Sequence, residues 1–561
     1  MNKAVAAILL LFAVTHAEAG NPKWMNRSRN AICDVIVYDS LGNETGRGTG
    51  FFTDAEGTGI SEYSLFLNAA KAITIDGKGV EREIRYIIGA DRTYNVIRFK
   101  SDADRKLPFL TITHNSEAEN ETLFLPVPST KGGNNVQFTI AKSERIEGDR
   151  SYYTLYGDMQ PGAAGLPVFN ADGLVVGIIQ DIAPADTCNY ALDSRYADSL
   201  SITSALSLNN DTYRSLTFPT ALPDTEEQAL VYLYMQQAGS RDNYLRLLDQ
   251  FIEQYPANAE GYFRKGTFYV SNDSTRSAEG IALLDKAVLL STDNGGTLFD
   301  YARLIYTVLT SDIPARPASW TLDDALEKID SALGYDRQPA YIQQKGNILF
   351  ALKRYAEALE CYNELNGTPL ASPETYYYTS VIKNELKYPQ DEIIETLDSA
   401  VNFYGKPYTS KVSPFILERA TTKENLGRHR EAVMDLNEYE QILGATGLSA
   451  EFYYFREQIE IKAHMYEQAV NDISHAVYLA PADLGLRLEQ ASLYLRIGMV
   501  DEAMPLTEHL TAENPENPDC RRLLGICLMR SDRKDEARIH LEKAKELGDQ
   551  LAGQLLQSLE D

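Results

Sequence analysis

The chain has 561 residues, of which 44% are hydrophobic and 24% charged, a composition typical of folded multidomain proteins and not of disordered or fibrous ones. Residues 21–215 hold 19 basic and 25 acidic residues, and residues 216–561 hold 33 and 54, within a net charge of −27. This acidic balance repels phosphate backbones and excludes nucleic acid as a partner. It is compatible either with solubility alone or with a preference for basic partners.

The first nineteen residues have the features of a secretory signal peptide. Lys3 gives a positive start, residues 4–14 form an apolar run, and Ala17-Glu18-Ala19 matches an A-x-A cleavage signal. We therefore expect residues 1–19 to be a signal peptide, with a buried N-terminal helix as the alternative. The mature chain should then be exported to the periplasm, the cell surface or the medium. No later apolar run is long enough to span a bilayer, so we expect no transmembrane segment in the mature chain.

Residues 20–205 have the pattern of an all-β domain. Short apolar runs separated by Gly, Asn and Asp predict strands of a barrel or sandwich; they lie at 33–38, 50–53, 72–75, 84–88, 96–99, 136–141 and 174–179. Residues 206–224 are polar and contain two prolines and the run Asn209-Asn210-Asp211, which predicts a linker.

The hydrophobic period changes from two to 3.6 residues after Thr225, which indicates helices. Three related segments begin at Ala469, Ala503 and Ala537, each 34 residues after the one before. Small residues also occur twelve positions earlier, as Gly525 does before Ala537. Two antiparallel helices cross closely only where small residues line their contact.

This 34-residue pattern resembles the tetratricopeptide repeat family. The resemblance implies an all-α solenoid over residues 225–561, built from eight or nine helical pairs, because one pair cannot bury its apolar face alone. In relatives that bind peptides, the first helix of each pair lines a groove. The matching groove residues in this chain are Gln343, Asn347, Phe350, Tyr454, Gln458, Ile461, Arg522 and Ile526. Packing between helices is the alternative role for the aromatic residues.

Three segments of the front half resemble trypsin-like (chymotrypsin-fold) serine peptidases. Residues 48–52 are similar to the family's G-x-G-F strand before the catalytic histidine, and residues 95–100 to the strand that carries the aspartate. Residues 161–170, followed by Asp172-Gly173, are similar to P-G-N-S-G-G-P-(L/V)-(V/F)-N with its returning hairpin. The resemblance implies an all-β double-barrel domain over residues 20–205.

The catalytic positions of that family are occupied by residues that cannot do its chemistry. Matching the motifs puts Ser64 at the histidine, Asn95 at the carboxylate and Ala164 at the nucleophile. The mechanism needs a hydroxyl nucleophile, an imidazole base and an orienting carboxylate, and the mature front domain has a single histidine, His114, on the wrong side of the aspartate strand. We therefore expect an inactive pseudoprotease.

Parts of the binding apparatus could remain. The turn of Gly162, Ala163, Ala164 and Gly165 could present backbone amides like an oxyanion hole, although the strand connection by itself could require these glycines. Asp158 lies six residues before Ala164, where the trypsin branch has an acid at the base of its specificity pocket. It could receive a basic side chain, or be an ordinary surface acid.

The cysteines and histidines predict neither a metal site nor a cofactor. There is no C-x-x-C motif, no histidine cluster and no phosphate-binding loop. Cys33 and Cys188 are the candidate disulfide pair, since an exported chain permits one.

The sequence therefore predicts a protein-binding scaffold or adaptor of the bacterial cell envelope with protein or peptide partners. One alternative is a peptidase-like enzyme that uses unconventional residues, such as Asp158 or Cys188, or that a partner subunit completes. Another is a front domain that serves only as a rigid cap for the repeats.

Overall fold

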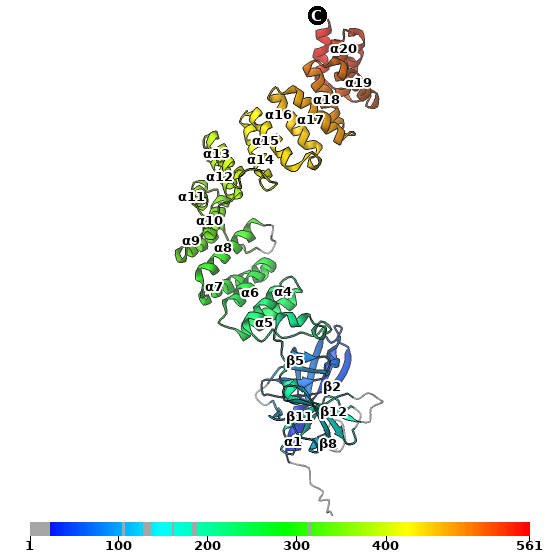
Figure 1. Cartoon of the computed structure of the whole chain (residues 1–561), viewed down its shortest axis with the longest axis vertical. Helices are drawn as coiled ribbons and strands as arrows, with labels where there is room; N and C mark the ends of the chain where they lie inside the picture. Colours follow the sequence, from blue (N-terminus) through cyan, green and yellow to red (C-terminus); the bar gives the residue numbers. More distant parts are fainter. Residues whose placement is uncertain are drawn as a thin grey trace, which may run out of the picture. The chain divides into compact units, whose positions relative to one another are not determined.

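The computed structural model describes residues 23–103, 107–126, 136–159, 162–181, 188–311, 313 and 316–560 (Figure 1). The expected signal peptide lies outside the described residues. The chain divides into two compact units, Met1–Tyr269 with Glu279–Leu290 and Val270–Ala278 with Ser291–Asp561. No helix among the described residues is both long and apolar enough to cross a membrane.

The front part of the first unit contains two closed antiparallel barrels of six strands each. The first has the order β1-β2-β3-β6-β5-β4 and the second β10-β11-β12-β9-β8-β7. The strands are β1 (Ile32–Tyr38), β2 (Glu44–Phe52), β3 (Thr58–Ser61), β4 (Lys71–Asp76), β5 (Glu81–Asp91), β6 (Val96–Ser101), β7 (Thr122–Leu125), β8 (Val136–Glu147), β9 (Arg150–Tyr156), β10 (Pro167–Phe169), β11 (Val175–Ile179) and β12 (Asn189–Asp193).

Each barrel encloses its own apolar core. In β4, buried Ala72 and Thr74 alternate with more exposed neighbours, as expected where one face of a strand is inside. Phe52 and Phe99 are fully buried in the first barrel, and Phe138 and Leu155 are buried in the second. Closure also leaves no open sheet edge, which removes unpaired backbone groups. The predicted double-barrel fold is confirmed.

Residues 206–224, which we expect to be a linker, connect the barrels to the helices as a segment that packs on the first barrel. This connecting segment forms the short helices η4 (Ala205–Asn209) and α3 (Asp211–Arg214) and then runs along the first barrel. The amide of Ile87 donates to Pro219 O at 2.9 Å, and the amide of Ala221 donates to Ile87 O at 2.7 Å. Phe218 is 4% exposed, and its ring lies 5.3 Å from that of Phe66. The connecting segment follows the barrel because its apolar side chains are buried in the barrel core.

The rest of the chain forms nine helical pairs, α4/α5 to α20/α21, and a last helix, α22, among the described residues. Their bounds are α4 (Glu226–Gln236), α5 (Arg241–Gln254), α6 (Ala259–Asn272), α7 (Ser277–Leu290), α8 (Asn294–Thr310), α9 (Leu322–Tyr335), α10 (Pro339–Ala351), α11 (Tyr355–Leu365), α12 (Pro373–Glu385), α13 (Gln390–Val401), α14 (Ser413–Asn425), α15 (His429–Leu443), α16 (Ala450–Lys462), α17 (Tyr466–Leu479), α18 (Leu484–Ile497), α19 (Val500–Glu513), α20 (Pro518–Arg530), α21 (Lys534–Glu546) and α22 (Gln550–Glu560).

Small residues lie where the helices of a pair cross, as the repeat pattern predicts. Ala503 and Ala537 are fully buried. A Cβ atom on Gly525 of α20 would lie 2.7 Å from Cγ of Leu541 on α21, closer than such atoms approach. The 34-residue pattern therefore reflects close contacts between the two helices of each pair.

The first helices of the array share a core with the connecting segment. Leu208 and Leu222 of this segment pack in one cluster with Leu233 of α4 and with Leu247 and Phe251 of α5. The first compact unit accordingly extends beyond the boundary predicted at residue 225.

Candidate functional site

Two of the three residues matched to catalytic positions are in direct contact in the first barrel. Ser64 begins the short helix η2 (Ser64–Phe66) after β3, and Asn95 precedes β6. The side-chain oxygen of Asn95 accepts a hydrogen bond from the Ser64 amide at 2.7 Å. Asn95 has a φ of +48°, a left-handed conformation that asparagine tolerates better than most residues. Neither an imidazole nor a carboxylate is present at this contact.

Ala164 lies in a tight turn before β10. The amide of Gly165 donates to Ile179 O at 2.9 Å, and the amide of Leu166 donates to Ala163 O at 3.1 Å. Gly165 has a φ of +77°, and a Cβ atom there would lie 2.8 Å from Thr49 O and 3.0 Å from Oε1 of Glu62. The turn of the second barrel therefore packs against Thr49 and Glu62 of the first barrel. Glu62 lies two residues before Ser64 in the chain.

Two amides of the predicted oxyanion-like turn, those of Ala163 and Ala164, donate no hydrogen bond to the described residues. Gly162 is exposed with a φ of +80°, and Ala163 is 5% exposed. The two positive φ values show that the backbone path itself favours glycine at both positions. The turn can offer a donor to a carbonyl or carboxylate, and the Ala164 methyl group cannot act as a nucleophile.

The structure does not support two predicted features of the front domain. Asp158 is exposed on the loop after β9, whereas a pocket base that receives a basic side chain would be enclosed. Cys33 and Cys188 are free thiols, so the candidate disulfide is not formed. The reason is their placement, with Cys33 buried on β1 of the first barrel and Cys188 directly before β12 of the second.

A tyrosine cluster beside Asn95 was not predicted from the sequence. The ring of Tyr94 lies 5.3 Å from that of Tyr196 and 6.0 Å from that of Tyr152, and all three are half-buried. The Tyr196 hydroxyl donates to a carboxylate oxygen of Asp91 at 2.6 Å. Burial, followed by this contact, raises the Tyr196 pKa. Because the tyrosines come from both barrels, only the folded structure brings them together.

The predicted groove residues all lie on first helices of their pairs, but they differ in accessibility. Gln343 on α10 is exposed, and Tyr454 on α16 is 38% exposed. The other six are half-buried, including Ile461 and Ile526, and four of these six have side-chain partners. Asn347 accepts from the Tyr362 hydroxyl, Phe350 contacts the rings of Tyr355 and Tyr378, Gln458 donates to Glu457, and Arg522 pairs with Asp519 and Asp549.

A buried charge network lies behind the exposed Tyr454 of α16. Arg456 contacts Asp472 and Glu440, both at 2.6 Å. Glu457 is completely buried, and its Oε1 atom has no hydrogen-bond partner among the described residues. Burial, and next the nearby Glu489 carboxylate, raises the Glu457 pKa to about 7. Burial, and next the nearby Asp472 carboxylate, also raises the pKa of Glu460, which is 2% exposed. The sequence gives no signal for this network, because charged residues ordinarily face solvent.

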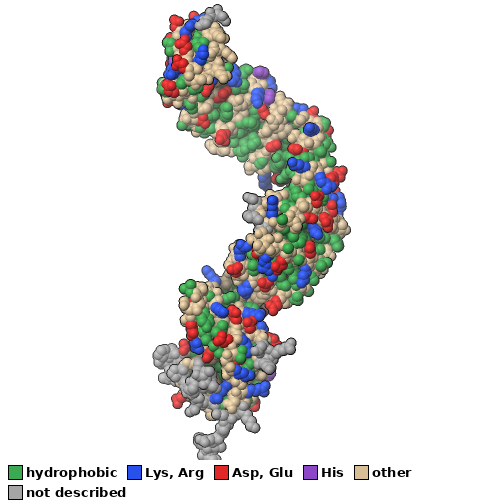
Figure 2. Space-filling model, turned by 180° about the vertical axis from the view of Figure 1, so that it is seen from behind, with side chains coloured by type: hydrophobic (Ala, Val, Ile, Leu, Met, Phe, Trp, Pro, Cys, Tyr) green, Lys and Arg blue, Asp and Glu red, His purple; other side chains and the backbone are tan. Residues whose placement is uncertain are grey.

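The surface of the repeats mixes charge with apolar area. Figure 2 shows acidic and basic side chains interspersed with hydrophobic ones on the face in view. A surface that mixes charged and apolar side chains suits a polypeptide ligand. Among the described residues, no group of His, Cys, Asp and Glu side chains could hold a metal ion.

Comparison with known families identifies the repeats. Tetratricopeptide repeat models match residues 339–366 and 498–559. These ranges cover α10/α11 and the region from α19 to α22. The helical part of the chain therefore contains tetratricopeptide repeats, which supports a protein-binding scaffold.

The chain is also similar to three curated proteins. It is 23% identical to the BBSome complex member BBS4 homolog of Drosophila melanogaster, over 57% of this chain and 66% of the relative. It is 26% identical to Protein O-mannosyl-transferase TMTC1 of Homo sapiens, over 21% of this chain and 15% of the relative. It is 24% identical to a TPR repeat-containing protein of Methanocaldococcus jannaschii, over 32% of each. The matches cover less than two thirds of each relative's length.

Proposed function

We propose that this chain is an exported protein-binding scaffold of the bacterial cell envelope, in which tetratricopeptide repeats hold a polypeptide and a trypsin-like front domain has no catalytic activity. The observation that carries the proposal is the repeat array, with Gln343 and Tyr454 accessible on first helices. An exposed amide and an exposed aromatic ring offer hydrogen bonds and apolar contact to a bound peptide.

The contact between Ser64 and Asn95 supports the inactivity of the front domain. The Asn95 carboxamide accepts a backbone amide where the peptidase mechanism needs a carboxylate that orients an imidazole. Ala164 has no side-chain hydroxyl that could act as the nucleophile. The amide of Ala164 and the nearby tyrosines remain suited to bind a polypeptide without cleaving it.

The charge of the helical part supports a basic partner. Residues 216–561 carry 33 basic and 54 acidic residues, so a cationic segment would be attracted at long range. This attraction should weaken with added salt, because the Debye length falls to about 8 Å at physiological ionic strength.

Site-specific photocrosslinking tests the proposed groove. A photoreactive phenylalanine analogue at Tyr454, on the first helix α16, should crosslink to a polypeptide partner in cell-envelope extract. The matched control is Tyr478, which is 79% exposed but lies on the second helix α17. Equal crosslinking at both positions, or none at Tyr454, would contradict binding in the groove.

Labelling with a fluorophosphonate, together with casein degradation, tests the proposed inactivity. Trypsin is the positive control, and the purified mature chain should give neither labelling nor degradation. Turnover that persists through repurification and disappears in an Asp158→Asn or Cys188→Ala variant would favour the alternative of an enzyme with unconventional residues.

A further inference from the structure

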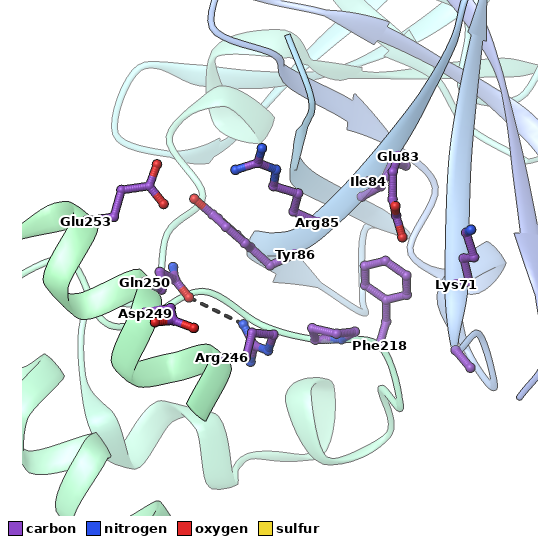
Figure 3. A pocket seen from close by; sticks show the side chains of 12 residues that line it. Lys71, Glu83, Ile84, Arg85, Tyr86, Phe218, Arg246, Asp249, Gln250 and Glu253 are labelled. Atoms are coloured by element: carbon purple, nitrogen blue, oxygen red, sulfur yellow. Dashed lines mark hydrogen bonds between the residues drawn. The ribbon is translucent and has the colours of Figure 1, made fainter. Parts of the chain in front are cut away.

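A pocket of about 490 Å³ lies within the first compact unit, between the first barrel and α5. This volume falls in the range of small-molecule sites. Figure 3 shows Tyr86 on β5 and Phe218 of the connecting segment on one side, with Arg246, Gln250 and Glu253 of α5 on the other. The pocket is separate from the repeat groove and from the junction of the two barrels.

Arg246 is the cation that is best placed to bind a ligand here. It is half-buried, and its guanidinium donates only to neutral acceptors: Asn243 Oδ1 at 2.9 Å, Thr220 O at 3.3 Å and Gln250 Oε1 at 3.4 Å. Among the described residues, no carboxylate oxygen lies within 4.0 Å of it. Burial lowers the Arg246 pKa, which indicates that the charge has lost hydration without gaining a counterion.

The other charged residues of the pocket lie at its exposed edge. Arg85 pairs with Asp102, and Asp249 pairs with Lys265. Lys71, Glu83 and Glu253 are also exposed, although they form no ion pair with the described residues. The inner wall, in contrast, is apolar or neutral and consists of Ile84, Tyr86, Phe218, Pro219 and Gln250. Arg246 is therefore the one cation among the lining residues that is half-buried and has no carboxylate partner among the described residues.

We propose that the pocket binds a carboxylate carried on an apolar residue. The carboxylate would pair with Arg246 in a charge-assisted contact, and the apolar group would lie against Tyr86 and Pro219. Two sources share this chemistry, the C-terminal residue of a polypeptide and a free small acid. The inference goes beyond the proposed function, because it concerns a different site and does not depend on the repeats.

Calorimetric titration of the full chain with four probes tests this site. The probes are the peptide Gly-Gly-Ala-Phe with a free C-terminal carboxylate, the same peptide with a C-terminal amide, N-acetylphenylalanine and N-acetylphenylalaninamide. We expect each acid to bind about tenfold or more tightly than its amide, because removal of a charged hydrogen-bond partner typically weakens an interaction by about that factor. A tighter peptide acid would identify a polypeptide C-terminus as the source, and a tighter N-acetylphenylalanine would identify a small acid.

Two variants separate loss of the site from loss of the fold. Gln250→Glu adds a carboxylate beside the guanidinium with almost no change in shape, so Arg246 would gain an internal partner and the probes should no longer bind. Arg246→Gln should also abolish binding, although it removes contacts to the connecting segment. Arg145→Gln, at an exposed position of β8, is the matched control and should bind normally.

Unchanged thermal melting of Gln250→Glu would show that its fold is intact. The proposal is overturned if that variant binds the acids as the unmodified chain does, if the amides bind as well as the acids, or if neither acid shows saturable binding. None of these results would affect the photocrosslinking test of the repeat groove.

Discussion

At the scale of single residues, Glu457 shows how burial can turn a carboxylate into a pH-dependent element. It is completely buried, with one oxygen unpartnered among the described residues, and its pKa is raised to about 7. The raised pKa means that folding favours the protonated form. Its contribution to stability is therefore fully present below the ordinary pKa of 4.5 and is lost as the pH rises through about 7.

Compared with the unmodified chain, Glu457→Gln should accordingly stabilise the helical repeats more at pH 8 than at pH 5. The expected gain is on the order of 1 to 3 kcal/mol, because each pKa unit corresponds to about 1.4 kcal/mol. Thermal melting at the two pH values measures it. The matched control Glu451→Gln, at an exposed position of the same helix, should show no such pH-dependent gain. A Glu457→Gln variant that is equally destabilised at both pH values would contradict a protonated native Glu457.

Two glycines in one turn allow the free-energy cost of a left-handed backbone to be compared with the cost of a steric clash. Gly162 and Gly165 have nearly the same φ, +80° and +77°. A Cβ atom on Gly162 would have open space, whereas one on Gly165 would lie 2.8 Å from Thr49 O. Gly162→Ala should cost about 1 kcal/mol from the left-handed backbone alone, and Gly165→Ala should cost clearly more. Denaturant unfolding measures both, and equal costs would argue against close packing of the turn on the first barrel.

At the scale of elements, the connecting segment is part of the first barrel's fold. Phe218 fills a space beside Phe66, so Phe218→Ala should destabilise the first unit by about 3 to 5 kcal/mol. Leu206→Ala, at a position that is 70% exposed, should have almost no effect. Thermal melting distinguishes the two variants. A Phe218→Ala variant as stable as the unmodified chain would mean that the segment behaves as a flexible linker.

The elements that the sequence predicts best are those with a strong local pattern. The spacing of Ala469, Ala503 and Ala537 predicts the helical pairs, because close helix crossing requires small residues at fixed intervals. The prolines and the polar run of residues 206–224 indicate a linker, but they do not predict that Leu216, Phe218 and Leu222 pack in apolar cores. A local pattern does not show whether a distant barrel will bury such residues.

At the scale of the whole molecule, the two compact units have separate cores. Scanning calorimetry of the full chain should therefore show more than one unfolding transition. Phe218→Ala should lower the transition of the first unit, and Glu457→Gln should raise that of the second at pH 8. A single transition that both variants shift together would show that the units unfold cooperatively.

The sequence by itself determined the all-β front domain, the helical repeats and the residues at the three matched positions, since strand and helix periods and short motifs are local properties. It also predicted which helices would carry Gln343 and Tyr454. Only the tertiary structure decided that Ser64 contacts Asn95, that the Ala164 turn packs on the first barrel, and that Cys33 and Cys188 remain apart. The same holds for buried Glu457 and the unpaired Arg246, because burial and counterions depend on residues brought together from distant parts of the chain.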